Sequence, residues 1–217
     1  MTHPILLKGH SITLRQLLPT HINALEAVAS NPLIWQNLPI EGCRKDVFWT
    51  WAYDTLDLQS RGLAHVFAIF DNKTGAIIGT TRFQDMDNCH HKTDIGWTWF
   101  APSVWGRGFN FEAKSLMLTH AFEVWQVQRV GFKVDERNVR SQRALENIGT
   151  TREGFFRNHM IRPDGSRRNS FFYGMTDEDW FAFAKDKINN ALLDAFIANN
   201  KVVNPPECVF NYAAQLA

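Results

Sequence analysis

The sequence predicts a mixed α/β fold, in which a strongly twisted central sheet is flanked by helices. Segments with alternating apolar residues, typical of strands, are interspersed with segments whose apolar residues recur every three or four positions, typical of helices. Between residues 94 and 134 the order is strand, helix, strand, as in a parallel crossover unit. The 217 residues, 45% of them hydrophobic and 21% charged, suit an ordinary globular protein.

The first half of the chain predicts two helices followed by a hairpin. Alternation of Ile12 and Leu14 with polar residues indicates a first strand. The elements expected here are that strand, ending near Arg15, a helix from Pro19 that Asn31-Pro32 stops, a helix from Val47 that Gly62 closes, and strands at 65–70 and 76–83 joined by a turn at 71–75.

The second half predicts the crossover unit, a closing hairpin and a terminal helix. The expected elements are a strand at 94–100, a buried helix at 108–125, a strand at 129–134, a short helix at 141–148 and hairpin strands at 153–160 and 168–175. A last helix carries an apolar stripe made of Trp180, Phe181, Phe183, Ala184, Ile188, Leu192 and Phe196. No internal repeat or low-complexity segment is found.

Bulk properties exclude several classes of function. The formal net charge of +1 does not suggest a nucleic-acid or acidic-membrane partner. No apolar run is long enough to span a bilayer, and the first residues lack a signal-peptide pattern. Cys43, Cys89 and Cys208 are odd in number and far apart, without zinc spacing or a disulfide framework. We therefore expect a cytoplasmic protein without a metal site.

A Gly-Arg-Gly turn joins the 94–100 strand to the buried helix. The first backbone N–H groups of a helix lack partners, and with the helix dipole they form an anion site. Gly106 and Gly108 permit close approach of a phosphate, and Arg107 adds a cation of suitable shape. The alternative is a plain tight turn. A Walker A motif is excluded by the missing Gly-Lys-Ser/Thr ending, and a Rossmann motif by Phe111 in place of its third glycine.

In its motifs and their order, the sequence resembles the GCN5-related N-acetyltransferase (GNAT) superfamily, and within it the RimJ/RimL-like branch. The resemblance covers roughly residues 10–180, about the size of one domain. The matching segments are Ile95-Gly96-Trp97-Thr98-Trp99, Trp105-Gly106-Arg107-Gly108-Phe109-Asn110, Glu112-Ala113-Lys114, Asn138-Val139-Arg140-Ser141-Gln142-Arg143-Ala144-Leu145 and Arg157-Asn158-His159-Met160. It implies a GNAT domain at 1–176 and a C-terminal helical extension at 177–217, packed on the domain or at a dimer contact.

The resemblance implies acetyl-CoA as cosubstrate. Its pyrophosphate would bind backbone amides of Arg107, Gly108, Phe109, Asn110 and Phe111. Its pantetheine arm would pair like an extra strand with Trp99 and Phe100, which requires the central strands at 94–100 and 129–134 to splay apart. A backbone N–H near Trp99 would stabilise the oxyanion, and Asn138 would bond the pantetheine. Trp105 and Asn110 depart from the family's turn pattern, so both a tighter and an impaired turn stay open.

The catalytic residues are less clearly marked. Many family members use a Tyr on the short helix to protonate the leaving thiolate, but Leu145 occupies that place and Ser141 is the substitute that the branch suggests. The alternative role for Ser141 is an N-cap of the 141–148 helix. As the base, Asp94 is the first candidate, followed by Asp85 and Asp87, although each also suits a solvated loop.

Two further polar pairs have plain structural alternatives. His90-His91 has no third ligand at a suitable spacing, which favours a loop over a metal site. Arg167 and Arg168 suit turn charges better than recognition of an acidic substrate.

The resulting functional prediction is an acetyl-CoA-dependent N-acetyltransferase that uses direct attack of a primary amine in a ternary complex. The acceptor would be a small molecule or a peptide N-terminus, and the protein a monomer or homodimer. The alternative from another class is a catalytically weak acyl-CoA-binding or sensing module, supported by the missing Tyr and by Asn110. A structural or dimerisation role for the 177–199 helix is a third possibility.

Overall fold

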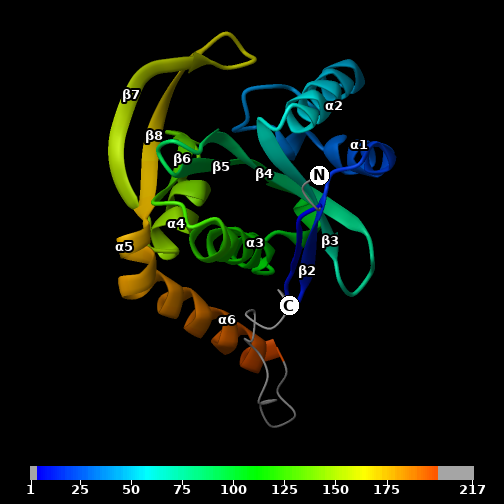
Figure 1. Ribbon diagram of the computed structural model, residues 1–217. Coiled ribbons are helices and arrows are strands. Elements are labelled where there is room, and N and C mark those ends of the chain that lie inside the picture. The colour runs from blue at the N-terminus through cyan, green and yellow to red at the C-terminus, as the bar shows by residue number, and fades with distance from the viewer. Residues whose placement is uncertain (1–3, 200–217) are drawn as a thin grey trace.

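The computed structural model describes residues 4–199, with side chains through Asp194, and shows one mixed sheet covered by helices (Figure 1). The strands are β1 (Leu6–Lys8), β2 (Ile12–Gln16), β3 (Ala64–Asp71), β4 (Ile77–Asp87), β5 (Lys92–Phe100), β6 (Arg129–Asp135), β7 (Thr151–Ile161) and β8 (Arg167–Thr176). The helices of four or more residues are α1 (Ile22–Ala29), α2 (Lys45–Ser60), α3 (Phe109–Thr119), a π-helical segment (His120–Val124), α4 (Val139–Asn147), a second π-helical segment (Trp180–Ala184) and α6 (Lys185–Asn199). Short 3₁₀ turns at Pro19–His21, Pro32–Ile34 and Pro102–Val104, and the single turn α5 (Asp177–Asp179), complete the set.

The described strands form one eight-stranded sheet with the order β1-β2-β3-β4-β5-β6-β8-β7. The pair β5–β6 is parallel, and the other neighbours are antiparallel. This arrangement confirms the predicted mixed α/β fold. The short β1 was absent from the sequence-based prediction, because three residues are too few to show alternation.

Alternation along β3 divides the core between the two faces of the sheet. Val66 and Ala68 are buried with α1 and α2, whereas Phe67 and Ile69 are buried with α3. Successive side chains of a strand point to opposite faces, so the helices cover the sheet on both sides. Figure 1 shows α3 beside the sheet in the middle of the view, and α1 and α2 together at the upper right.

The central strands β5 and β6 separate after three residue pairs. They are paired from Lys92↔Arg129 to Asp94↔Gly131, and no pairing joins Ile95–Phe100 to the rest of β6. The separation confirms the predicted splay. It opens a wedge at the carboxyl ends of two parallel strands, which is the usual place for a ligand in such sheets.

Two helices differ from the predicted boundaries. The helix predicted at 108–125 continues as α3 only to Thr119 and then becomes π-helical, since Trp125 N–H bonds the carbonyl of His120. The helix predicted at 141–148 begins two residues earlier, at Val139. Periodicity fixes a helix's buried face better than its ends, because end residues bury little.

The C-terminal segment lies against the same core as α3. Thr176 caps α5 by accepting from Asp179 N–H, and Trp180, Ala184 and Ile188 are buried in the core cluster that contains Phe122. The ring of Trp180 stacks on Phe122 with centroids 5.5 Å apart. The side chain of Phe196 and residues 200–217 lie outside the described part. No described helix has the length and apolarity needed to cross a membrane.

Candidate functional site

A cavity of about 410 Å³ occupies the wedge between β5 and β6. Its walls come from β5, β6, α3 and α4, and the hairpin β7–β8 closes one side with His159, Met160 and Arg168. The segment between α1 and α2 also contributes at Asn37–Pro39. The cavity therefore results from the splay, and it brings together Asp94, Asn110, Asn138 and Ser141, which the sequence had pointed to.

The start of α3 has the backbone geometry that the predicted anion site requires. Gly108 adopts the left-handed conformation, with φ of 81°, and the first intrahelical bond runs from Glu112 N–H to its carbonyl at 3.0 Å. The N–H groups of Phe109, Asn110 and Phe111 precede that bond and have no intrahelical partner. A Cβ at Gly108 would meet nothing within 4 Å, so the backbone here is open to a ligand.

The neighbours of this helix start are arranged for access. Arg107 is exposed beside it, and Asn110 lines the cavity, which links the anion site to the wedge. The turn itself is held in place from behind: the indole of Trp105 donates to the carbonyl of Phe100 at 3.0 Å, and Arg140 stacks on the Trp105 ring. The departure of Trp105 and Asn110 from the family pattern therefore leaves the turn intact.

The structure places Trp99 and Phe100 differently from the rest of β5. Their side chains are buried in the two cores, and their backbone pairs with Thr80 and Gly79 of β4. Neither residue lines the cavity; on β5 its wall is formed by residues 94–98. Backbone pairing of a pantetheine arm at Trp99 and Phe100 remains a prediction.

A β-bulge lies in the β5 wall of the cavity. The register of β4 against β5 shifts between Thr80 and Arg82, and Trp97 has a positive φ of 50°. A bulge interrupts the regular ladder and re-aims backbone groups. The bulge residues Trp97 and Thr98 line the cavity. The bulge was not predicted from the sequence.

Asn138, not Ser141, caps α4. The Asn138 side chain accepts from Ser141 N–H at 3.0 Å, and Ser141 is the third residue of the helix. The alternative role of Ser141 as the N-cap is therefore wrong, because the helix begins two residues before the predicted start. Both residues line the cavity, and no hydrogen bond of the Ser141 hydroxyl is found among the described residues. Asn138 keeps its amide N–H₂ group for a ligand.

Asp94 lies where β5 and β6 separate and lines the cavity. Its carboxylate is 3.2 Å from the ammonium of Lys133, which also donates to Asp85 at 2.7 Å. Asp87, the other carboxylate considered, accepts from His90 N–H in the β4–β5 turn and does not line the cavity. Of the three acidic residues predicted as bases, Asp94 is the one that reaches the site.

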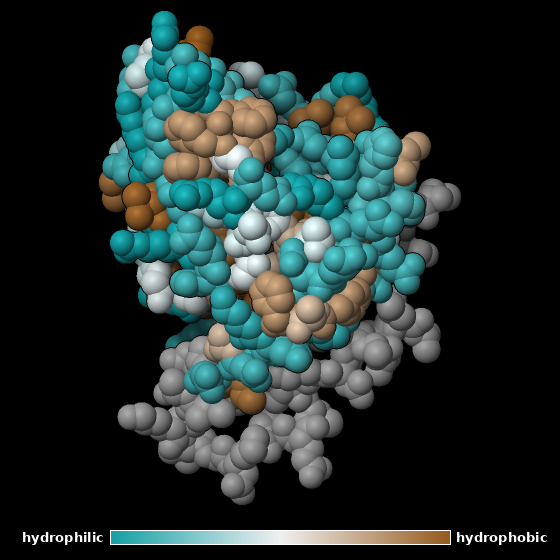
Figure 2. Space-filling view, turned by 90° about the vertical axis from the view of Figure 1, so that its left-hand side faces the viewer, coloured by the Kyte–Doolittle hydropathy of each residue, from teal (hydrophilic) through white to brown (hydrophobic). Residues whose placement is uncertain are grey.

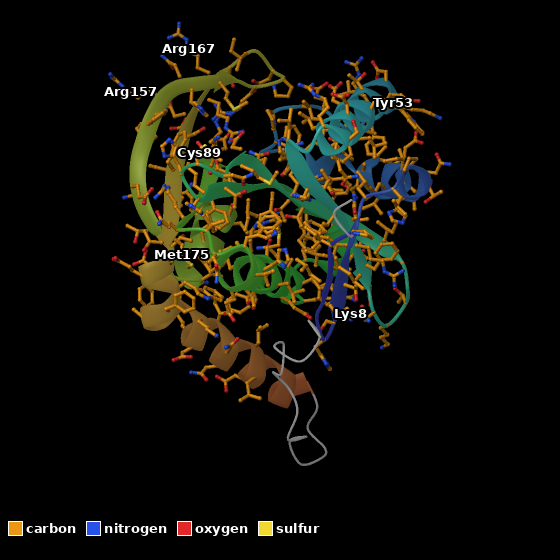
Figure 3. All side chains as sticks on the ribbon, viewed as in Figure 1. Lys8, Tyr53, Cys89, Arg157, Arg167 and Met175 are labelled. Carbon is orange, nitrogen blue, oxygen red and sulfur yellow. The ribbon has the colours of Figure 1, made fainter. Side chains whose placement is uncertain are left out.

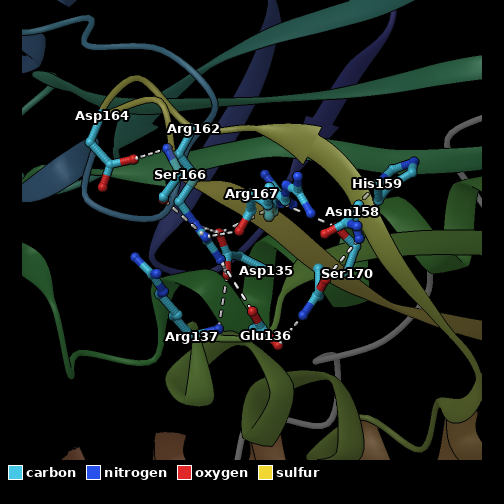
Figure 4. Close-up of polar contacts among 12 residues, drawn as sticks. Asp135, Glu136, Arg137, Asn158, His159, Arg162, Asp164, Ser166, Arg167 and Ser170 are labelled. Carbon is cyan, nitrogen blue, oxygen red and sulfur yellow. Dashed lines mark hydrogen bonds and ion pairs between the residues drawn. The ribbon is translucent and has the colours of Figure 1, made fainter.

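A buried polar cluster closes the far side of the cavity (Figure 4). Asp135 accepts from Arg162 at two points, both 2.8 Å, and lies 3.6 Å from Arg168. Although burial raises the pKa of Asp135, the hydrogen bonds from Arg162 and the Arg137 N–H hold it below its usual value. The cluster fixes the β7–β8 hairpin to the end of β6.

The two adjacent arginines of β8 have different environments. Arg167 is exposed at the outer end of the hairpin, together with Arg157 (Figure 3), as expected for turn charges. Arg168 is buried, donates to the Ser170 hydroxyl at 3.1 Å and lines the cavity. The interpretation of Arg168 as a turn charge is therefore wrong: β8 begins one residue earlier than predicted, and alternation turns its side chain inward.

The same hairpin carries exposed apolar residues among polar ones (Figure 2). Phe155, Phe156, Met160 and Ile161 on β7 are all exposed, and the ring of Phe156 packs on Phe172 of β8. In the described residues, no group of three or more His, Cys, Asp and Glu is placed to hold a metal ion.

One titratable residue of the cavity, Lys114, was not predicted from the sequence. It lies on α3 one turn after Asn110, is buried, and donates from Nζ to the Thr98 hydroxyl at 2.9 Å. Burial lowers the pKa of Lys114 from 10.5 to about 7. The signal was present in the sequence as a charge inside a helix that is otherwise apolar on most sides.

With this geometry established, comparison with known proteins identifies the family. The family model described as "Acetyltransferase (GNAT) domain" matches residues 11–151. The chain belongs to this family. The match runs from β2 through α4 and includes the start of α3, so the cavity is largely built from GNAT-domain residues.

Curated relatives of this GNAT domain are distant. "Uncharacterized N-acetyltransferase p20" of Bacillus licheniformis is 29% identical over 48% of this chain and 57% of its own length. "Uncharacterized N-acetyltransferase YoaA" of Bacillus subtilis (strain 168) is 25% identical over 72% of this chain and 89% of its own. The matches to p20 and to YnaD span 57% and 52% of those proteins, a little over half their length.

Solved structures match over a longer stretch. A protein from T. thermophilus that carries an acetyltransferase name is 31% identical, with a TM-score of 0.76 over 88% of this chain and 99% of that one. A GCN5-related N-acetyltransferase from Brucella melitensis has a TM-score of 0.77 at 24% identity, over 87% of this chain and 86% of that one. The second likeness concerns the fold alone.

Proposed function

We propose that this GNAT domain transfers the acetyl group of acetyl-CoA to a primary amine, by direct attack of the amine on the thioester. The observation that carries the proposal is the junction of two features in one cavity: the open amides at the start of α3 and the wedge between β5 and β6. The first suits a pyrophosphate, and the second exposes strand backbone to an extended arm.

The residues of the wall supply the remaining chemistry. The amides of Phe109, Asn110 and Phe111 would bind the pyrophosphate, with Arg107 beside them, and Asn138 would bond the pantetheine through its free N–H₂ group. A backbone N–H of the β5 bulge would polarise the thioester carbonyl. Gly108 leaves open space beside these amides for the pyrophosphate.

Asp94 is assigned as the base, and Ser141 as a hydrogen-bond donor to the leaving sulfur. The acceptor amine must lose a proton, and Asp94 is the carboxylate of the cavity that is not held by the arginine cluster. Lys133, whose ammonium lies 3.2 Å away, holds the Asp94 carboxylate in place. The Ser141 hydroxyl faces the same space from α4 and would donate a hydrogen bond to the leaving sulfur.

The acceptor is a small-molecule amine or a peptide N-terminus. A relative from Escherichia coli (strain K12), 25% identical over 57% of this chain and 63% of its own length, is named "[Ribosomal protein uS5]-alanine N-acetyltransferase". This name supports inclusion of peptides that begin with alanine in a substrate panel. The RimJ/RimL-like assignment of the chain rests on the same relative and on the motif order.

The test combines turnover with binding. Release of CoA thiol is measured with acetyl-CoA and a panel of amines that includes amino acids, polyamines and alanine-terminated peptides. Turnover with at least one amine is expected. CoA binding measured by calorimetry without turnover on any amine would instead support the acyl-CoA-binding module.

The binding site itself is tested by Gly108→Asp, with Gly75→Asp as the matched control. Both glycines have positive φ, 81° and 71°, and both have open space at the Cβ position, so the two substitutions cost similar backbone strain. Gly75 lies in the β3–β4 turn, away from the cavity. We expect Gly108→Asp to weaken CoA binding by about tenfold or more, through repulsion of the pyrophosphate, and Gly75→Asp to leave it unchanged. Equal CoA affinity of the two variants would exclude the α3 start as the site.

A further inference from the structure

The cavity contains one cation without a carboxylate partner among the described residues, Lys114. The other charged groups that face it are paired with one another: Asp94 of β5 with Lys133 of β6, and Asp135 of β6 with Arg162 and with Arg168 of β8. His159 of β7 lies on the same side as Arg168 and contacts the Ser170 hydroxyl. None of the ion pairs found in the described part of the chain includes Lys114.

The position of Lys114 is set by the fold rather than by chance contact. Asn110 and Lys114 are four residues apart on α3, so they share the face of the helix that looks into the cavity. Lys114 Nζ donates to the Thr98 hydroxyl on the β5 bulge and lies 5.5 Å from the centre of the Phe132 ring on β6. The Thr98 hydroxyl in turn is 2.7 Å from that of Thr81. The ammonium thus lies between the two splayed strands.

Burial of an unpaired lysine destabilises the folded protein. Its ammonium is desolvated, which lowers the pKa of Lys114 from 10.5 to about 7, and no carboxylate of the described residues offsets the loss of hydration. An apolar residue of similar length would be more stable at this position. A costly group in a ligand cavity indicates a functional role, because functional sites are where stability is commonly given up.

The proposed reaction needs a proton donor at the sulfur. As the amine nitrogen bonds to the acetyl carbon, the C–S bond breaks and its electron pair leaves with sulfur as a thiolate. An ammonium can then give a proton to sulfur: an N–H bond breaks, an S–H bond forms, and the neutral lysine regains a proton from solvent. A thiol such as that of cysteine has an ordinary pKa of about 8.5, so transfer from a group that titrates near 7 is favourable.

We propose that Lys114 is a catalytic residue of this GNAT domain, which delivers a proton to the departing CoA sulfur. The assignment rests on the proposed acetyl-CoA chemistry. It complements Ser141, whose hydroxyl can donate a hydrogen bond to the sulfur but is too weak an acid to give up a proton at neutral pH. The two residues reach the cavity from different helices, α3 and α4.

The activity test compares Lys114→Met, Lys114→Arg and the control Lys45→Met, which changes an exposed lysine of α2, in the full chain. The expected result is a decrease in kcat of about 10²-fold in Lys114→Met. Lys114→Arg is expected to show a similar decrease in kcat, because arginine keeps the charge but does not release its proton. Lys45→Met should leave kcat unchanged. CoA affinity should be retained in all three variants.

The pH dependence provides a second measurement. The protonated lysine is the active form, so the ratio of wild-type to Lys114→Met turnover should fall as pH rises through about 7. Ionisation of the acceptor amine affects both proteins equally and cancels in this ratio. A ratio that does not change with pH would overturn the assignment.

Stability gives a measurement that needs no turnover. Because the folded pKa is depressed, stability contributed by Lys114 is lost as pH falls from about 10.5 toward 7. Lys114→Met should therefore melt at a higher temperature than wild type, and the gap should widen from about pH 10 to about pH 7. A lower melting temperature at every pH would show that Lys114 is a structural residue and overturn the proposal.

The outcomes separate this proposal from the proposed function. Absence of thiol release by the wild-type protein with every amine would remove the proposed function, and the role of Lys114 with it. Wild-type turnover with a fully active Lys114→Met or Lys114→Arg protein would overturn the Lys114 proposal alone. Loss of CoA affinity in both Lys114 variants, with wild-type melting behaviour, would assign Lys114 to cosubstrate binding and overturn the catalytic assignment.

Discussion

At the residue scale, two neighbours at the start of α4 have distinct roles that sequence periodicity could not separate. Asn138 caps the helix by accepting from Ser141 N–H at 3.0 Å, which leaves the Ser141 hydroxyl for the cavity. The Asn-x-x-Ser spacing alone suits a cap at either residue. The choice depends on where the helix begins, and that depends on how the chain leaves β6 at Asp135.

Because the two residues have different roles, their substitutions should affect different quantities, turnover in one case and stability in the other. Ser141→Ala should lower turnover by about tenfold or more, since the leaving sulfur loses a donor, and should leave stability nearly unchanged, because the cap is elsewhere. Asn138→Ala should decrease the free energy of unfolding by about 1 kcal/mol through loss of the cap. Thiol-release kinetics and urea unfolding measure the two effects. Unaltered turnover in Ser141→Ala would remove Ser141 from the chemistry.

At the element scale, the helical segment after β8 packs on the core through one of its faces. Trp180, Ala184 and Ile188 are buried in the core with Phe122, whereas Phe181 is 61% exposed. The indole N–H of Trp180 also donates to Glu123 at 3.1 Å, which joins this segment to the end of the α3 region. The described part of the extension therefore packs on its own chain. A dimer contact remains a separate prediction, and the exposed ring of Phe181 would be available to it.

Substitution of adjacent aromatic residues tests this packing. Trp180→Ala removes a fully buried ring and should decrease the free energy of unfolding by about 3–5 kcal/mol. Phe181→Ala changes an exposed ring and should alter it by no more than about 0.5 kcal/mol. Equal losses in the two variants, measured by urea unfolding, would show that the segment does not pack as described. Light scattering of Phe181→Ala reports whether the exposed side contributes to a dimer.

At the scale of the whole molecule, the sheet consists of two parts joined at a narrow contact. β1–β5 and β6–β8 meet through the pairs from Lys92↔Arg129 to Asp94↔Gly131, while α3 spans both. The contact ends where Asp94 lies against Gly131, at a position where a Cβ on Gly131 would collide with the Asp94 carboxylate.

Gly131→Ala is therefore expected to destabilise the junction. The added methyl group forces the Asp94 carboxylate aside and away from Lys133, which should decrease the free energy of unfolding by about 1 kcal/mol. The control Gly154→Ala in β7, where a Cβ would have no neighbour closer than 3.9 Å, should cost much less. Asp94→Ala removes the obstacle and leaves Lys133 paired with Asp85, so the double variant should recover most of the loss. Additive losses in this cycle would contradict the close contact.

The sequence by itself determined the class of fold and predicted an anion site at the start of α3. Alternation and helical periodicity located most of the strands and helices, because burial of one face imposes those patterns on any sequence. The Gly-Arg-Gly turn before an apolar helix predicted the local geometry of the candidate anion site, since the left-handed residue at Gly108 and the open amides after it depend only on neighbouring residues. The strand splay followed only through the family resemblance.

Tertiary structure alone decided which side chains share the cavity. Lys114, Arg168 and the bulge at Trp97 reach it through long-range packing of α3, β8 and β4, and no local pattern distinguishes an inward charge from a solvated one. The same sequence features that suggested a turn charge at Arg168 and a cap at Ser141 take other roles once β8 and α4 begin earlier than periodicity implies. The pKa of Lys114 is likewise a property of its burial, because desolvation depends on every element around it.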